Sequence, residues 1–210
     1  RDPMKKTLYI MDGHGLLYRA YYAFIGRPLF TTKGENTSAI HGFMRMFLRL
    51  LKDFSPEHLV CAFDSKQKTF RHELFPDYKA KRQKAPEDLL SQAETVREML
   101  EKLGVPLRVS EGWEADDVIG TLVDAAKKRG MRCVIVSGDK DLLQLVDEDV
   151  TVLAIRKGTA ELEPVDAAKV LEQWKVPPGS IADLLALMGL SLIHISEPTR
   201  LLSISYAVFC

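Results

Sequence analysis

The sequence has few cysteines and no long apolar run. Its three cysteines, at positions 61, 133 and 210, are too few and too scattered for a disulfide framework or a CxxC metal site. No stretch has the pattern of a transmembrane or targeting segment, because Asp12 ends the apolar run near the N-terminus. We therefore expect a cytoplasmic protein without a membrane partner.

An excess of either charge is also missing. Lysine plus arginine and aspartate plus glutamate both number 29, so the net charge is zero. This balance argues against a uniformly basic nucleic-acid binder, although it does not test for local segregation of charge. The apolar share of 46% and the charged share of 28% exclude a disordered chain and indicate a folded core.

Short apolar segments alternate with amphipathic ones along the chain. The predicted strands are Thr7–Met11, His58–Phe63, Val105–Val109, Arg132–Val136, Val150–Ile155 and Glu161–Val165. The predicted helices are Gly15–Phe24, Asn36–Asp53, Pro86–Leu103, Ala115–Arg129, Asp166–Trp174 and Ser180–Met188. Strands separated by helices predict an α/β domain with a mostly parallel central sheet flanked by helices.

Three of the first four predicted strands run directly into acidic residues. Asp12 ends the first strand, Asp64 follows the second, and Asp139 and Asp141 follow the fourth. The C-terminal ends of parallel strands lie along one edge of a sheet, and such folds bind ligands at that edge. We therefore expect these side chains to converge, although they lie far apart in the sequence.

Three further acids, Glu114, Asp116 and Asp117, open a predicted helix, and the first and last of them share a face. So many carboxylates in one cleft require compensation, because like charges raise each other's pKa. An all-oxygen set suits Mg²⁺ or Mn²⁺ rather than Zn²⁺. Two such ions about 4 Å apart hold a phosphodiester, generate a hydroxide nucleophile and stabilise the leaving oxygen. The predicted metal ligands and catalytic acids are Asp12, Asp64, Glu114, Asp116, Asp117, Asp139 and Asp141.

Each of these acids also has a plainer interpretation. A single aspartate after a strand is often a turn residue, and Asp116 or Asp139 could favour a helix N-terminus electrostatically. Four separate segments that deliver acids to one edge favour a shared site. The five histidines show no metal-ligand spacing, and we interpret them mostly as surface or packing residues.

The segment Lys66–Lys84, called the basic segment below, carries an excess of positive charge. Seven lysines and arginines against two acids give it a net charge of +5. Glu111–Asp149 has ten acids against five bases, a net charge of −5. Phe70, Leu74 and Tyr78 recur every four residues, which gives one apolar stripe if the segment is helical. Lysine and arginine with interleaved aromatic residues suit single-stranded nucleic acid, whereas the plainer alternative is a solvated loop.

These residues resemble the 5′–3′ exonuclease domain of bacterial DNA polymerase I, a structure-specific 5′ nuclease related to flap endonucleases and PIN-domain ribonucleases. The resemblance runs from about Met4 to Gly189. Its motifs are Asp12-Gly-His-Gly-Leu-Leu-Tyr18-Arg19-Ala-Tyr, Phe63-Asp64, Thr69-Phe70-Arg71-His-Glu, Tyr78-Lys79-Ala-Lys-Arg82, Glu114-Ala-Asp116-Asp117-Val-Ile-Gly and Gly138-Asp139-Lys-Asp141.

The resemblance implies a PIN-like 5′ nuclease fold with a helical arch, and a two-metal enzyme that cuts DNA at 5′ ends and flaps, including RNA-primed strands. It implies a monomer with a polymerase domain in cis in the parent protein. It assigns Asp12, Asp64, Glu114 and Asp116 to the first metal site, and the other three acids to neighbouring ligands and half of the second site. The implied DNA-binding residues, of which Lys79 is also catalytic, are Tyr18, Arg19, Arg71, Tyr78, Lys79, Lys81 and Arg82.

The resemblance ends after Gly189. The family continues with Asp-Ser-Ser-Asp-Asn-Ile-Pro-Gly, which supplies two more metal-site aspartates and opens a helix–three-turn–helix element that grips duplex DNA. Residues 190–210 contain Glu197 as their only acid and resemble a translated sequencing adapter. We expect residues 1–3 to be an upstream remnant, 4–189 an incomplete 5′ nuclease domain, and 190–210 a non-native tail. Such a chain is expected to bind DNA weakly and to cleave it poorly or not at all.

Other functional classes remain open at this point. A PIN-type ribonuclease would share the acidic edge, and a non-catalytic flap-binding module would carry the same acids without needing metal. A phosphatase of the haloacid dehalogenase type also places an aspartate after its first strand. It normally has a second acid two residues later, where this sequence has His14.

Overall fold

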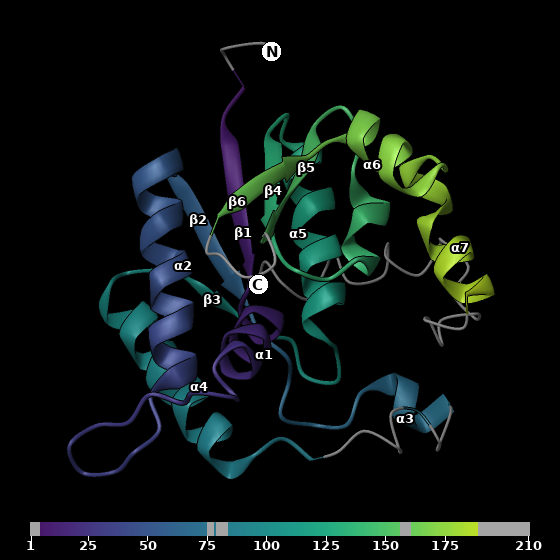
Figure 1. The fold of residues 1–210 in the computed structure, drawn as a ribbon. Helices are drawn as coiled ribbons and strands as arrows, with labels where there is room; N and C mark the ends of the chain where they lie inside the picture. Colours follow the sequence, from purple (N-terminus) through teal and green to yellow (C-terminus); the bar gives the residue numbers. More distant parts are fainter. Residues whose placement is uncertain (1–4, 75–77, 79–83, 156–160, 189–210) are drawn as a thin grey trace.

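The computed structural model describes residues 5–74, 78, 84–155 and 161–188 (Figure 1). The strands are β1 (Thr7–Asp12), β2 (His58–Ala62), β3 (Leu107–Arg108), β4 (Arg132–Val136), β5 (Val150–Ile155) and β6 (Leu162–Val165). The α-helices are α1 (Gly13–Ala23), α2 (Ser38–Phe54), α3 (Phe70–Leu74), α4 (Glu87–Lys102), α5 (Ala115–Lys128), α6 (Ala167–Trp174) and α7 (Ile181–Leu187), with 3₁₀ turns η1 (Asp141–Leu145) and η2 (Pro178–Ser180).

The strands form one sheet in the order β3-β2-β1-β4-β5-β6. All neighbouring pairs are parallel except β5 and β6, which are antiparallel. The prediction of a mostly parallel sheet flanked by helices is therefore confirmed. The predicted third strand is shorter than expected, because only Leu107 and Arg108 pair with β2.

Two apolar cores cover the two faces of the sheet, with α1, α2 and α4 on one face and α5, α6 and α7 on the other (Figure 1). Side chains along a strand alternate between faces. In β1, Ile10 belongs to the core under α5, whereas Met11 belongs to the core under α1 and α2. Both cores exclude water, so the sheet is a rigid platform for the residues that follow its strands.

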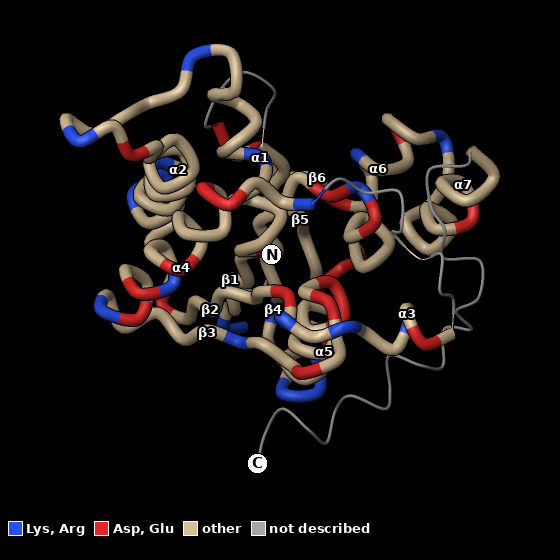
Figure 2. Tube along the Cα trace, turned by 90° about the horizontal axis from the view of Figure 1, so that it is seen from below, with Lys and Arg blue, Asp and Glu red and all other residues tan. Residues whose placement is uncertain are grey.

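The C-terminal ends of β1, β2 and β4 lie side by side, because Asp12 pairs with Ala62 and Met11 pairs with Val136. Asp12, Asp64 and Asp139 therefore start from neighbouring points of one edge. Figure 2 shows acidic positions gathered near β4 and α5. The predicted convergence of strand-end acids is thus built by the register of the parallel strands.

The structure describes the basic segment at residues 66–74, 78 and 84. Helix α3 ends at Leu74, which is exposed, and Tyr78 lies in a turn. Phe70 packs against the ring of Trp113, with centroids 4.7 Å apart. The single apolar stripe, which depended on the segment being helical, is not seen in the described residues, because Phe70, Leu74 and Tyr78 have three different environments. The remaining basic residues of the predicted arch, Lys79, Lys81 and Arg82, lie outside the described residues.

Residues 1–3 and 190–210, to which the sequence assigns an upstream remnant and a foreign tail, also lie outside the described residues. In the part of the chain that the structure describes, none of the helices is long and apolar enough to span a membrane.

Candidate active site

Asp12 is the most deeply buried acid of the sheet edge, with 3% of its surface exposed. It ends β1 and begins α1, where its Oδ1 accepts a hydrogen bond of 2.8 Å from the backbone N–H of Gly15. Its Oδ2 accepts a second bond of 2.7 Å from the hydroxyl of Ser137. Position 15 needs glycine, because a Cβ there would collide with the Asp12 carboxylate. The Asp12 carboxylate is thus held in place by α1 through one oxygen and by the turn after β4 through the other.

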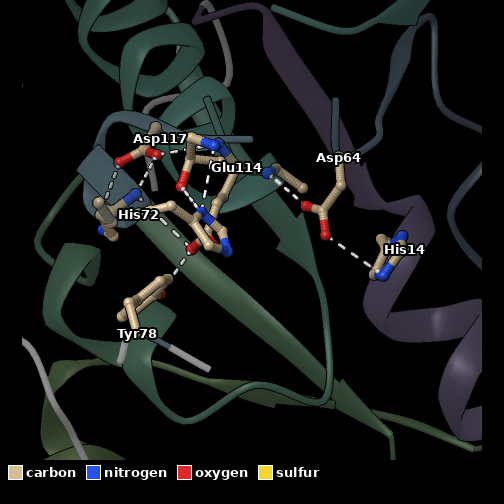
Figure 3. Close-up of polar contacts among 9 residues, drawn as sticks. His14, Asp64, His72, Tyr78, Glu114 and Asp117 are labelled. Atoms are coloured by element: carbon tan, nitrogen blue, oxygen red, sulfur yellow. Dashed lines mark hydrogen bonds and ion pairs between the residues drawn. The ribbon is translucent and has the colours of Figure 1, made fainter. Parts of the chain in front are cut away.

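Asp64 lies on the next strand end and contacts two other elements (Figure 3). Its Oδ1 accepts a hydrogen bond of 2.7 Å from the backbone N–H of Ala115, at the start of α5. Its Oδ2 lies 3.2 Å from Nε2 of His14 on α1. His14 is partly exposed, as expected for a surface or packing residue, and its contact with Asp64 is an addition to that interpretation. A clue was available in the sequence, because His14 lies two residues after the strand-end Asp12.

The N-terminus of α5 brings further acids to the same edge. Glu114 caps the helix, and Asp116 lies in its first turn. Burial, followed by the charges of Asp12, Asp139, Asp64 and Glu114, raises the pKa of Asp116 from an ordinary value of 3.8 to about 8. No donor in the described part of the chain bonds the Asp116 carboxylate. Burial and the repulsion among these acids therefore both disfavour the ionised form of Asp116.

The pKa of Asp12 is also raised, to about 6. Burial is the largest cause, and the charges of Asp139 and Asp64 add to it, whereas the hydrogen bonds from Ser137 and Gly15 lower the pKa. We call Asp12, Asp64, Glu114, Asp116 and Asp139 the acidic cluster. Within the described ranges, no three acidic, histidine or cysteine side chains are arranged to hold a metal ion as they stand. The acids of the cluster therefore lie near one another, but their side chains are not yet oriented to bind one metal ion together.

Asp139 and Asp141 follow β4 in a turn organised by Ser137. The backbone N–H of Asp139 donates to the Ser137 hydroxyl over 2.9 Å, and the N–H of Asp141 donates to Oδ1 of Asp139 over 2.9 Å. Ser137 is almost fully buried, and the same hydroxyl donates to Asp12. Sequence reasoning missed this serine. Its position two residues before an aspartate is typical of a serine turn, which was the available signal.

Replacing Ser137 with alanine is expected to lower the free energy of unfolding by about 1–3 kcal/mol, because it leaves the buried Asp12 oxygen and the Asp139 amide without their partner. Urea denaturation measures this loss. Ser91→Ala, at an exposed serine that donates only to the carbonyl of Asp88, is the matched control with an expected change within about 0.5 kcal/mol. Equal effects of the two substitutions would contradict the bridging role of Ser137.

Asp117 points to a different partner from the other acids. Its two oxygens accept two hydrogen bonds, each of 2.7 Å, from the guanidinium of Arg71 on α3. Burial lowers the pKa of Arg71, but the hydrogen bonds and charge of Asp117 outweigh it, so the pKa lies above its ordinary value. Tyr78 donates a bond of 3.0 Å to Oε2 of Glu114 (Figure 3). Arg71 and Tyr78, which the family resemblance assigned to DNA, thus contact carboxylates of the protein itself.

Arg19 and Tyr18 extend the site along α1. The Arg19 guanidinium donates to the carbonyl of Ile155 over 2.8 Å. It also lies against Gly138, where a Cβ would be 3.0 Å from Nη1. The ring of Tyr18 lies 4.7 Å from that of His14. These contacts place Arg19 beside the turn that carries Asp139, and Tyr18 beside the residue that contacts Asp64.

A family model described as the 5′-3′ exonuclease, N-terminal resolvase-like domain matches residues 7–175. This match covers most of the chain. The chain belongs to this family. Among relatives of the 5′-3′ exonuclease domain, it is 40% identical over 188 residues to DNA polymerase I of Mycobacterium bovis, with 90% of this chain and 21% of the relative covered. It is 42% identical over 184 residues to the 5′-3′ exonuclease of Aquifex aeolicus, with 88% and 62% covered.

Among solved structures, the exonuclease domain is similar to the bacteriophage T5 D15 flap endonuclease in a complex with DNA and metal ions. The TM-score is 0.67 at 20% identity, with 95% of this chain and 74% of that chain covered. This likeness shows the fold and confirms the predicted 5′ nuclease architecture. The chain spans about a fifth of the length of the mycobacterial DNA polymerase I that it matches.

Proposed function

We propose that the chain is a metal-dependent 5′ nuclease domain that hydrolyses phosphodiester bonds of DNA near 5′ ends and flaps. The observation that carries the proposal is the acidic cluster, in which acids from three strand ends and the start of α5 meet at one edge of the sheet. Membership of the 5′-3′ exonuclease family supports this reaction over a phosphatase or a purely structural role.

The donors of the cluster fit a hard divalent cation. They are carboxylates, and a bound dication would offset the burial and the repulsion that together raise the pKa of Asp116 to about 8. We propose two ions of Mg²⁺ or Mn²⁺, which supply a metal-bound nucleophile and neutralise the leaving oxygen when they are present. The proposed ligands of the first ion are Asp12, Asp64, Glu114 and Asp116, with Asp139 and Asp141 for part of the second.

The chain's own residues prepare this chemistry. Gly15 and Ser137 fix the two oxygens of Asp12, and the amide of Ala115 fixes Asp64, so less side-chain freedom is lost when ligands bind. Arg19, beside the turn of Asp139, is a proposed contact for a DNA phosphate. The other proposed DNA contacts are Tyr18, Lys79, Lys81 and Arg82, with Lys79 also acting in catalysis.

The proposed substrates are 5′ ends and flaps, including RNA-primed strands. The proposed setting is the bacterial cytoplasm, as a monomer with a polymerase domain in the same polypeptide. The relatives support this setting. The chain matches about a fifth of a much longer Mycobacterium bovis protein, which is a DNA polymerase I.

Incubation of a 5′-labelled DNA flap with excess protein tests the proposal. Excess protein reveals a slow single turnover. We expect cuts near the flap junction with Mg²⁺ or Mn²⁺, none with EDTA, and weaker inhibition by single-stranded RNA than by an unlabelled DNA flap.

The alternatives give different outcomes in the same assay. Preferred cutting of RNA would favour a PIN-type ribonuclease. Flap binding without any cut, unchanged by EDTA and by Asp12→Asn, would favour a non-catalytic binding module. Either result would refute the proposed function.

A further inference from the structure

The start of the basic segment is fastened to the N-terminus of α5 by several contacts. Arg71 of α3 forms a two-pronged bond to Asp117. The ring of Phe70 packs at a tilt against Trp113, and the backbone N–H of Phe70 donates to the carbonyl of Gly112 over 3.2 Å. Tyr78 donates to Glu114. Backbone, aromatic and charged contacts thus hold the same two pieces of chain together.

Both oxygens of the Asp117 carboxylate accept hydrogen bonds in these contacts. Oδ1 accepts from Nη2 of Arg71, and Oδ2 accepts both from Nη1 of Arg71 and from the backbone N–H of Glu114 over 3.0 Å. Only 9% of the Asp117 side chain and 16% of the Arg71 side chain are exposed. A planar guanidinium matches a carboxylate in this arrangement, and water does not weaken the pair. Binding a metal ion through Asp117 would require breaking it.

The same pair determines the surroundings of Glu114. Asp117 fixes the backbone of Glu114 through the capping box at the start of α5. Nη1 of Arg71 lies 3.6 Å from Oε2 of Glu114, the same oxygen that accepts from Tyr78. The position of the Glu114 carboxylate therefore depends on where α3 and Tyr78 lie.

We propose that Asp117 and Arg71 form a positioning pair that fixes the Glu114 carboxylate against the base of the basic segment, and that Asp117 is not itself a metal ligand. Arg71 acts through Asp117 and Glu114 rather than through DNA. The pair connects the segment that is proposed to receive DNA with a ligand of the proposed metal site. This inference rests on the proposed function for its metal-binding part, whereas the pair itself is independent of that function.

A double-mutant cycle on the 210-residue chain tests the pair. Mn²⁺ affinity is measured by isothermal titration calorimetry for the unchanged chain, Arg71→Ala, Asp117→Ala and the double variant. We expect each single variant to weaken Mn²⁺ binding about tenfold, as for residues that orient a ligand, and the double variant to be no weaker than either single variant. If Asp117 were a direct metal ligand, the result would differ. Asp117→Ala would then weaken Mn²⁺ binding by the same factor in the Arg71→Ala background as in the unchanged chain.

Conservative variants separate orientation from simple loss of structure. Arg71→Lys keeps the charge but loses the fork, and Asp117→Asn keeps an acceptor for the Glu114 amide. We expect the Mn²⁺ affinity of both conservative variants to lie between that of the unchanged chain and that of the alanine variants. If an alanine variant does not fold, the same cycle is run with Arg71→Lys and Asp117→Asn. The matched control is Asp166→Ala, which removes the acid that caps α6 and is expected to leave Mn²⁺ affinity unchanged.

Fluorescence of Trp113 tests the pair without metal. In a Trp174→Phe background, Trp113 is the only tryptophan. We expect the same shift of its emission in Arg71→Ala and Asp117→Ala, with no further shift in the double variant. Unchanged emission in both, or shifts that add, would overturn the pair. Absence of Mn²⁺ binding by the unchanged chain would refute the proposed function instead, and the fluorescence would still decide on the pair.

Discussion

Replacing Asp116 with asparagine is expected to lower the rate of metal-dependent flap cleavage by a factor on the order of 10³ or more. Asp116 interacts with the rest of the acidic cluster, because burial and then the charges of four other acids raise its pKa. Asparagine keeps the shape of the side chain but removes the charge that attracts a divalent cation. When several catalytic residues act as a unit, replacing one of them lowers the rate almost as much as replacing all of them. Single-turnover cleavage of a labelled 5′ flap measures the effect.

The same substitution is expected to stabilise the metal-free protein. A neutral asparagine side chain at this position no longer repels the neighbouring acids, so the free energy of unfolding in EDTA at pH 8 should rise by about 2 kcal/mol or more. Asp183→Asn, at an exposed position of α7, is the matched control and should change neither property. Cleavage at the unchanged rate, or a lower stability in EDTA, would show that Asp116 does not have this role.

The stability of the metal-free chain is expected to fall as the pH rises from about 5 to about 8. The pKa values of Asp12 and Asp116 are raised in the folded protein to about 6 and about 8, from 3.8. Between these values the folded state binds more protons than the unfolded state, so the free energy of unfolding decreases with pH. Below about pH 4 both acids are protonated and ionisation costs no stability, whereas above about pH 8 both are ionised and the loss of stability is complete. A loss of about 5–6 kcal/mol is expected between pH 5 and pH 8, since one pKa unit corresponds to about 1.4 kcal/mol and Asp116 and Asp12 together contribute about four such units.

Urea denaturation at several pH values in EDTA measures this loss, and comparison with Asp116→Asn isolates it from other titrating groups. The slope should be smaller in the variant. Mg²⁺ should restore stability most at pH 8, because it binds the ionised cluster of the folded state. A stability that rises towards pH 8 in EDTA, with the same slope in both proteins, would contradict the electrostatic account of the cluster.

The positions of the strand-end acids could be predicted from the sequence, because local patterns determine them. Apolar runs of strand length end at Asp12, Asp64 and Asp139, and the parallel arrangement brings such ends to one edge. The alternation of strands and helices also predicts the parallel arrangement. Pattern and topology together were sufficient for this part of the site.

The direction of the side chains could not be predicted in this way. Asp116 and Asp117 are adjacent in the sequence, yet one faces the acidic cluster and the other faces Arg71, 46 residues away. A helix turns successive residues to different sides, and the available partners depend on tertiary packing. The surroundings of Phe70, Leu74 and Tyr78 also depend on tertiary packing, because Phe70 packs against Trp113, Leu74 is exposed and Tyr78 donates to Glu114.

Titration of Mn²⁺ into the metal-free chain tests most directly the central claim, that the acidic cluster is a divalent-cation site. We expect saturable binding that is weakened about 100-fold or more by Asp116→Asn and is unchanged by Asp166→Ala, which removes a distant helix-capping acid. Binding that is absent from the unchanged chain, or that is equally strong in Asp116→Asn, would contradict the claim.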